Sequence, residues 1–119
     1  MRRWVKRSGS GPAIWPDAGD IVWLNFTPHA GREEAGHRPA LVLSPIAYNS
    51  KTSLMLCCPM TTQMKGYPFE VPIAAAVPSV VLSDQIKSVD WRVRKAKRKG
   101  KVTADELADV RAKIRALIG

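Results

Sequence analysis

Four short stretches of the sequence hold residue types that can bind or cleave a phosphodiester. The first is "REEAGHRP", residues 32–39, in which two carboxylates precede Arg38 at the start of an apolar run. A guanidinium presents a planar pair of donors that matches the oxygens of a phosphate. A surface ion pair with Glu33 or Glu34 is the commoner use of an arginine in such a loop, so this stretch alone leaves both roles open.

The second stretch is "CPMTTQ", residues 58–63, at the end of an apolar segment. Threonine is a good strand former, and two adjacent threonines most simply close the edge of a sheet. A hydroxyl beside a guanidinium can instead hold a phosphate oxygen. Because side chains alternate along a strand, we expect Thr61 and Thr62 on opposite faces, so that only one of them can share a pocket with Arg38.

The other two stretches are polar or basic. The third is "SDQIKS", residues 83–88, whose composition is also that of an ordinary polar strand. Its Asp84, Gln85 and Lys87 combine groups that can bond to base edges with a positive charge. The fourth is "RVRKAKRKGK", residues 92–101, in which seven residues are Lys or Arg. So dense a run predicts a solvated hairpin or loop that attracts any polyanion and carries no sequence information.

The overall composition is typical of a small protein that binds a polyanion. The 119 residues suit one domain, and 19 Lys and Arg against 10 Asp and Glu leave a net charge of +9. Charge alone does not choose among nucleic acid, a membrane surface and an acidic protein. His29, His37 and the adjacent Cys57 and Cys58 lack the spacing of zinc ligands, so we expect no metal site. We also expect no disulfide, because neighbouring strand residues point to opposite faces.

The first 18 residues are expected to form a flexible basic arm, and residues 19–119 a single domain. The start, "MRRWVKR", has the charge of a signal peptide, but a Ser/Gly run follows where the apolar part would have to be. No stretch approaches the roughly 20 apolar residues of a membrane helix. The sequence therefore predicts a cytoplasmic protein that makes no membrane contact.

Alternating and apolar segments predict a domain rich in β-strands. In residues 20–26 apolar side chains alternate with a mixed set of side chains, as in a strand with one buried face. Residues 27–37 have no period and predict a long exposed loop. Residues 39–44 and 53–60 are apolar on both faces and predict central strands, with a turn or short helix at 45–52. Further short strands are expected at 67–73, 79–89 and 90–94.

The last segment is the clearest helix in the sequence. Thr103 and Glu106 have the spacing of a capping box, and Val102 can pack against Leu107 as a hydrophobic staple. Helical periodicity places five apolar side chains on one face, namely Leu107, Val110, Ile114, Leu117 and Ile118.

Taken together and in this order, the motifs resemble those of the MazF toxins of bacterial toxin-antitoxin modules. The resemblance runs through "GDIVWLNF", "GHRPALVLSP", "YNSKT", "CCPMTTQMKGYPFEV", "SDQIKSVDWR" and "KGKVTADEL", and it leaves out most of the N-terminal arm. It implies an α+β fold, a small SH3-like β-barrel of the CcdB/MazF type with a C-terminal α-helix and a short additional helix.

The resemblance also implies an activity and partners. It implies a homodimeric, metal-independent endoribonuclease that needs no cofactor and cuts single-stranded RNA at short sequences. We expect the cognate antitoxin to carry an acidic disordered tail, which would compete with RNA for the same basic surface.

Several residues of this sequence match functional positions of the family. Arg38 of "GHRP" and Thr61 of "MTTQ" match the catalytic arginine and threonine, and Glu33 matches an acidic loop residue linked to activity. Thr62 is then structural. The RNA-binding residues expected on this basis are Trp23, Asn25, Lys65, Asp84, Gln85 and Lys87.

Cleavage without a metal requires the 2′-hydroxyl to attack its own phosphate. One group must accept its proton, a second must stabilise the added charge, and a third must protonate the leaving 5′-oxygen. Arg38 suits the second task, and because guanidinium groups stay protonated, we assign the proton to Glu33 or His37. Two other functions stay open, a basic barrel that binds nucleic acid without cutting it and a toxin of the same fold that binds DNA gyrase.

Overall fold

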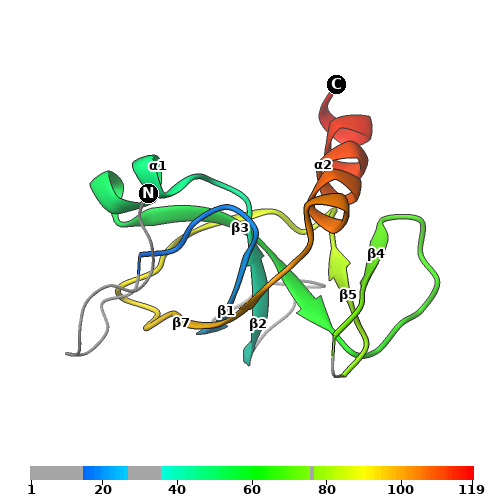
Figure 1. The fold of residues 1–119 in the computed structure, drawn as a ribbon, viewed down its shortest axis with the longest axis horizontal. Helices are drawn as coiled ribbons and strands as arrows, with labels where there is room; N and C mark the ends of the chain where they lie inside the picture. The colour runs from blue at the N-terminus through cyan, green and yellow to red at the C-terminus, as the bar shows by residue number, and fades with distance from the viewer. Residues whose placement is uncertain (1–14, 27–35, 76) are drawn as a thin grey trace.

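The computed structural model describes residues 15–26, 36–75 and 77–119 (Figure 1). Within these ranges the chain forms a seven-stranded sheet and two helices. The strands are β1 (Asp20–Asn25), β2 (His37–Val42), β3 (Leu54–Thr61), β4 (Glu70–Ile73), β5 (Ser79–Leu82), β6 (Lys87–Asp90) and β7 (Lys97–Lys101). The helices are α1 (Ile46–Thr52) and α2 (Ala104–Ile118).

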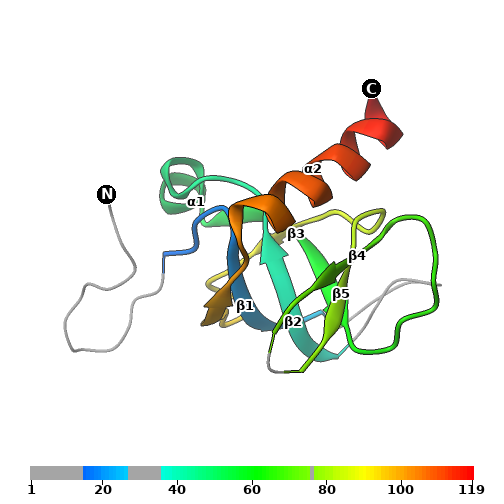
Figure 2. The same ribbon diagram turned by 45° about the vertical axis from the view of Figure 1, so that its right-hand side comes forward.

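The strands pair antiparallel and form one curled sheet. The strand order is β4-β5-β3-β2-β1-β7, and β6 pairs with the first half of β3. The long strand β3 therefore joins two parts of the sheet, because its end pairs with β5. Figures 1 and 2 show α2 beside β4 and β5, and α1 at the opposite end of the sheet. The predicted class, a small curled β-barrel with a C-terminal helix and a short additional helix, is confirmed.

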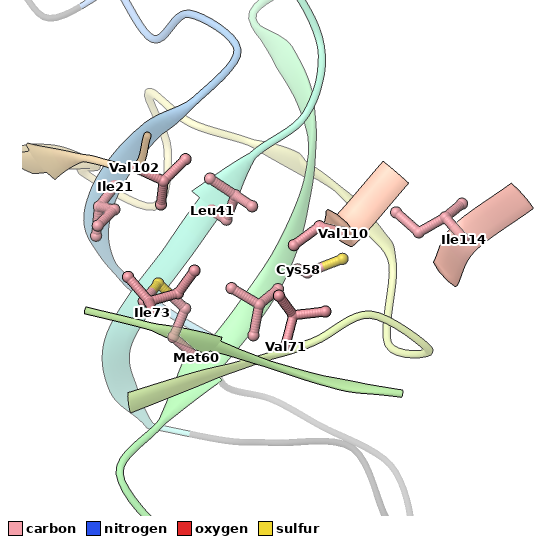
Figure 3. Packing of buried hydrophobic residues seen from close by; sticks show 10 residues of the cluster. Ile21, Leu41, Cys58, Met60, Val71, Ile73, Val102, Val110 and Ile114 are labelled. Atoms are coloured by element: carbon pink, nitrogen blue, oxygen red, sulfur yellow. The ribbon is translucent and has the colours of Figure 1, made fainter. Parts of the chain in front are cut away.

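Two apolar cores lie on the two faces of the sheet. The alternation predicted for the first strand is present, since Val22 and Leu24 are buried in one core and Ile21 in the other. The adjacent Cys57 and Cys58 divide between the cores in the same way, and both are free thiols. Figure 3 shows the second core, in which Ile21 and Cys58 lie with apolar side chains of α2. This core holds the C-terminal helix against the sheet.

Helix α2 begins as predicted. Thr103 Oγ1 accepts a hydrogen bond from Glu106 N at 3.1 Å, and Glu106 Oε1 accepts one from Thr103 N at 2.9 Å, which completes the capping box. The apolar face of the helix is buried as far as Ile114, whereas Leu117 and Ile118 are 47% and 72% exposed. Figure 2 shows the reason, because the last turns of α2 extend beyond the sheet.

Of the segment 90–94, predicted as a strand, Asp90 ends β6 and residues 91–94 form a turn. The Asp90 carboxylate accepts hydrogen bonds from Arg92 N and Val93 N at 3.0 Å and from Ser53 Oγ at 2.9 Å. The bond from Val93 N, followed by those from Ser53 and Arg92, lowers the pKa of Asp90 because these donors favour the ionised carboxylate. Local side-chain bonds therefore turn the chain where a strand was expected.

The basic run 92–101, predicted as a solvated loop or hairpin, contains strand β7. This strand pairs with β1 and forms one end of the strand order. Its lysine and arginine side chains are exposed. Charged edge strands of this kind oppose pairing with a further strand.

The chain enters the sheet through a segment that also supports α1. Pro16 is buried, and Asp17 Oδ1 accepts a hydrogen bond from Ile46 N at 2.9 Å. This bond caps α1 from outside the helix, because its own N-cap residue, Pro45, supplies no side-chain cap.

Two predicted segments fall wholly or partly outside the described residues. Residues 1–14 of the expected arm lie outside the described residues, so the domain boundary after residue 18 stays a prediction. Residues 27–35 of the expected loop do as well, although its two ends are joined by a hydrogen bond from Phe26 N to Gly36 O at 2.9 Å. Among the helices of the described chain, none is long and apolar enough to cross a membrane.

Candidate nucleic-acid interface

Two neighbouring strand ends bring Arg38 and Thr61 together. Arg38 lies near the start of β2, and Thr61 is the last residue of β3. The two strands are antiparallel and pair Ala40 with Pro59, so two residues further along Arg38 lies beside Thr61. Arg38 Nη1 also donates a long hydrogen bond to the Met60 carbonyl, at 3.5 Å. The antiparallel register therefore brings Arg38 and Thr61 to the same end of the sheet.

Both side chains line one hollow of about 820 Å³, which we call the Arg38 hollow. The Trp23 and His37 rings stack in its wall, with centroids 6.2 Å apart and planes 22° apart. Lys99 Nζ lies 5.4 Å from the centre of the Trp23 ring. The hollow thus combines a guanidinium, a hydroxyl, an imidazole and an ammonium group around one aromatic side chain.

The prediction that only one threonine shares a pocket with Arg38 is wrong, because Thr61 and Thr62 both line the Arg38 hollow. Strand β3 ends at Thr61, so the alternation that would send Thr62 to the other face no longer applies. Thr61 Oγ1 accepts a hydrogen bond from Gln63 N at 3.1 Å, which turns the chain just beyond the strand.

A second hollow, which we call the Asp84 hollow, shares Thr61 and Gln63 with the first. Its volume is about 450 Å³. Its remaining walls come from the loop between β3 and β4, from β4, from the end of β5 and from the segment after it. They comprise Lys65, Tyr67, Glu70, Leu82, Asp84 and Gln85. Amide, carboxylate and phenol groups of this kind can bond to the edges of unstacked bases.

One carboxylate closes the loop between β3 and β4. The two oxygens of Glu70 accept hydrogen bonds from Lys65 N at 3.2 and 3.1 Å, and Oε1 also accepts one from Gly66 N at 2.9 Å. Gly66 has a φ of +77°, a conformation that favours glycine. Lys113 Nζ, from α2, donates to Pro68 O at 2.6 Å. The loop is therefore held from both a strand and a helix.

Three predicted site residues are not found in these hollows. Asn25 lies at the end of β1, where its carbonyl accepts a hydrogen bond from Arg94 Nη1 at 2.9 Å. Lys87 Nζ lies 6.0 Å from the centre of the Phe26 ring. Neither residue lines the Arg38 hollow or the Asp84 hollow. Glu33 lies outside the described residues, and the roles of all three stay predictions.

The two cysteines near these strand ends are poor nucleophiles. Burial raises the pKa of Cys57 to about 12 and that of Cys58 to about 12, so both thiols stay protonated at neutral pH. Across the part of the chain that the structure describes, no three His, Cys, Asp or Glu side chains are grouped so that they could hold a metal ion. A covalent step by a thiolate is therefore not available from these residues.

Comparison with known proteins identifies the family. Residues 17–118 match the family described as "PemK-like, MazF-like toxin of type II toxin-antitoxin system". The chain belongs to this PemK/MazF family. The "Endoribonuclease toxin MazF" of Escherichia coli (strain K12) is 54% identical over 105 residues, which are 87% of this chain and 95% of that protein. The predicted family, and with it the class of endoribonuclease toxin, is confirmed.

Solved MazF structures share the fold of this PemK/MazF toxin. The crystal structure of MazF (Form-I) from Deinococcus radiodurans has a TM-score of 0.86 and 55% identity, and the match covers 90% of this chain and 99% of that chain. A chain from the MazE-MazF (Form-II) crystal structure of the same organism has a TM-score of 0.79 and 51% identity, covering 90% of this chain and 98% of that one.

Residues that line the hollows and that motif analysis of the PemK/MazF toxin missed include Gln63, Tyr67, Lys99 and Lys101. Gln63 and Tyr67 had a usable signal, because they lie in the loop that follows a buried strand, and loops on a rigid scaffold often carry function. Lys99 had none. It is one of several basic residues in a run whose spacing does not distinguish them.

Proposed function

We propose that this MazF-family toxin cleaves single-stranded RNA by attack of a 2′-hydroxyl on the adjacent phosphate, without a metal ion. One product ends in a 2′,3′-cyclic phosphate, or in the 3′-phosphate formed from it. The other begins with a 5′-hydroxyl, because the 5′-oxygen takes up a proton as its bond to phosphorus breaks. The observation that carries the proposal is that Arg38 and Thr61 line the same hollow at the ends of two paired strands. Cleavage of mRNA at short sequences would inhibit translation and growth.

Arg38 is the group that stabilises charge in this reaction. Its side chain is half-buried, so the guanidinium is partly shielded from water at the rim of the hollow. Attack by the 2′-oxygen places additional negative charge on the non-bridging oxygens of the phosphate. A planar pair of N–H donors that is already in place can bond to two of these oxygens at once.

Thr61 supplies a further hydrogen bond to the same phosphate. Its Oγ1 accepts from Gln63 N, so the orientation of the hydroxyl is restricted. The hydroxyl hydrogen can then be donated to a phosphate oxygen beside the Arg38 guanidinium. Two donors of different chemistry would in this way hold one phosphate against the end of the sheet.

Glu33 and His37 are the two candidates for the base that takes the 2′ proton. His37 is exposed at the start of β2, and its ring stacks on Trp23 in the wall of the Arg38 hollow. Imidazole is the most common general base in enzymes, and a carboxylate can serve as well. If Glu33 is the base, the cleavage rate of Glu33→Gln should no longer rise with pH. If His37 is the base, His37→Gln should show this loss instead.

The RNA strand is expected to pass over Thr61 from one hollow to the other. Thr61 lines both hollows, so a phosphate held there would leave the flanking nucleotides in the Arg38 hollow and the Asp84 hollow. The net charge of +9 favours binding of the backbone. We further propose that the protein acts as a cytoplasmic homodimer and that the acidic disordered tail of an antitoxin competes for this surface. The MazE-MazF complexes among the solved neighbours support an antitoxin partner.

The decisive experiment is incubation of a long unstructured RNA with the purified protein in EDTA, followed by identification of the fragment ends. We expect cleavage at a short recurring sequence, with cyclic or 3′-phosphate ends and 5′-hydroxyl ends. Loss of cleavage in EDTA that added metal restores, or 5′-phosphate ends, would show that the mechanism is wrong. Tight binding with no cleavage in any buffer would favour the binding module over the enzyme.

A further inference from the structure

Strand β7 contains a β-bulge at Lys99. Gly100 pairs with Ile21 of β1, and Arg98 pairs with the next residue of β1, Val22. The register therefore skips Lys99, which is the extra residue on its strand. Bulges of this kind bend a strand locally and change the direction in which a side chain points.

The bulge changes which basic side chains share a face of β7. Arg98 and Lys101 are three residues apart, so in a regular strand they would point to opposite faces. With one residue looped out they come to the same side, and each has a nitrogen 3.8 Å from Asp20 Oδ1. Lys99 Nζ lies 5.4 Å from the centre of the Trp23 ring in the Arg38 hollow, which Lys101 also lines.

Asp20 is a fully buried carboxylate at the start of β1. Its Oδ2 accepts a hydrogen bond from Asp17 N at 2.9 Å, and its Oδ1 faces Arg98 and Lys101. Burial raises the pKa of Asp20, whereas the Asp17 bond and the two cations favour its ionised form. A buried ion pair is weak evidence for stability, because desolvation offsets much of the attraction. The position of Asp20 beneath the bulge suggests a role in geometry instead.

We propose that Asp20 is a positioning residue for substrate binding, which holds the bulge of β7 so that Lys99 is aimed into the Arg38 hollow and binds a phosphate there. Lys99 touches the substrate, and Asp20 acts through Arg98, Lys101 and the strand between them. That the phosphate belongs to an RNA strand rests on the proposed function. The proposal concerns a phosphate next to the one held by Arg38 and Thr61.

The first test compares Lys99→Met with Lys97→Met. Both variants lose one positive charge from the same strand, but the Lys97 side chain does not line the Arg38 hollow. The probe is a random-sequence RNA pool with 2′-O-methyl groups throughout, which cannot be cleaved by 2′-hydroxyl attack, and binding is followed by fluorescence anisotropy over a range of salt. We expect Lys99→Met to lower the slope of log affinity against log salt by about 0.7, the share of one phosphate contact on a single strand. Lys97→Met should change the slope much less.

The second test uses Asp20→Asn, which keeps the shape of the side chain and its ability to accept the Asp17 bond. This change makes the protein one charge more positive, so an account based on net charge alone predicts tighter binding of the same probe. The positioning role predicts that Asp20→Asn binds the probe more weakly than the parent does. The loss of affinity should be no larger than the loss caused by Lys99→Met. The positioning role also predicts that Asp20→Asn causes no further loss when it is added to Lys99→Met, because both changes remove the same contact.

The outcomes separate this proposal from the proposed function. Equal effects of Lys99→Met and Lys97→Met, or tighter binding by folded Asp20→Asn, would overturn the positioning role while the parent still cleaves RNA. If the parent binds the methylated pool but cuts no natural RNA, the proposed function fails and the binding comparison still decides the role of the bulge. If the parent does not bind the pool at all, both proposals fail. Circular dichroism and thermal melting check that Asp20→Asn is folded. If it is not, the comparison of Lys99→Met with Lys97→Met decides whether Lys99 binds the phosphate.

Discussion

The Arg38 hollow is walled mainly by paired strands, whereas the Asp84 hollow is walled largely by a loop and a turn. Arg38 and Trp23 belong to β2 and β1, whose backbone bonds run along both strands. Lys65 and Tyr67 belong to the loop between β3 and β4, which depends on the Glu70 carboxylate for its shape. A strand that pairs on both sides holds a side chain more firmly than a loop closed by a few bonds.

This difference suggests a division of labour across Thr61, which lines both hollows. Chemistry needs groups fixed to within a fraction of an ångström, which the strands of the Arg38 hollow can supply. Recognition of bases tolerates more movement, and a loop can change in sequence without disturbing the sheet. Changes on the strand side should therefore reduce the rate of cleavage, and changes on the loop side should alter which sequences are cut.

The largest effect is expected from Arg38→Lys. Lysine keeps the charge but loses the planar pair of donors, so it cannot bond to two phosphate oxygens at once. The loss of one donor to a developing oxyanion typically costs about 10²- to 10³-fold in rate, and we expect a loss of that order at saturating RNA. Single-turnover cleavage gives the rate, and binding of a 2′-O-methyl RNA gives the affinity, which should change little. An unchanged rate would remove Arg38 from the chemistry.

A smaller loss of rate is expected from Thr61→Val, which replaces the hydroxyl by a methyl group of similar size. A hydrogen bond to a charged group contributes about 1.5 to 3 kcal/mol, so the cleavage rate should fall by about tenfold to a hundredfold. Thr61→Ser is the matched control, because it retains the hydroxyl and should retain most of the rate. If Val and Ser at this position behave alike in single-turnover assays, the hydroxyl does not contact the phosphate.

Gln85→Leu tests the loop side of the comparison. Gln85 is half-buried in the wall of the Asp84 hollow, and leucine removes its amide at nearly constant size. The loss of one neutral hydrogen bond to a base would cost about 1 kcal/mol, or roughly fivefold, and only for sequences that carry that base. Sequencing of cleaved RNA ends should show weaker selection at one position beside the cut, with the maximal rate retained. Lys51→Met is the control, since Lys51 belongs to α1 and lies outside both hollows. A uniform loss over all sequences would contradict base recognition there.

The smallest effect is expected on stability, from Gly66→Ala in the loop. A methyl group there would meet no atom within 4 Å, so its cost is the backbone strain at a φ of +77°. We expect the free energy of unfolding in urea to fall by about 1 kcal/mol. Gly100→Ala in β7 is the control on the strand side, because its added methyl group also meets open space and no positive φ is involved. Equal losses in the two variants would show that the loop is no more dependent on its conformation than the strand.

Local patterns predicted the elements whose signals lie within a few residues. The alternation in residues 20–26 became a strand with Val22 and Leu24 on one face, and the capping box of Thr103 and Glu106 formed as expected. Both signals depend on geometry that a single strand or helix already has. The same kind of pattern failed just after Asp90, because a carboxylate that bonds to the N–H groups of Arg92 and Val93 favours a turn over a continued strand.

The candidate site was predicted only in part, for a related reason. The resemblance to MazF placed Arg38 and Thr61 in one site, and both residues do line one hollow. It did not show that Thr62 joins them, since that follows from where β3 ends. It also did not separate Asn25 and Lys87 from the side chains that line the hollows.

The sequence by itself determined the alternating strands, the start of α2 and the excess of positive charge, because each follows from the residues of one segment. Only the tertiary structure decided what the basic run does. The skipped register between β1 and β7 turns Lys99 toward Trp23 and brings Arg98 and Lys101 over Asp20. A bulge is a property of two strands in register, so the residues of one strand do not encode it alone. Strand pairing across the sheet therefore selects, from a run of similar charges, the lysine whose ammonium group lies over the Trp23 ring.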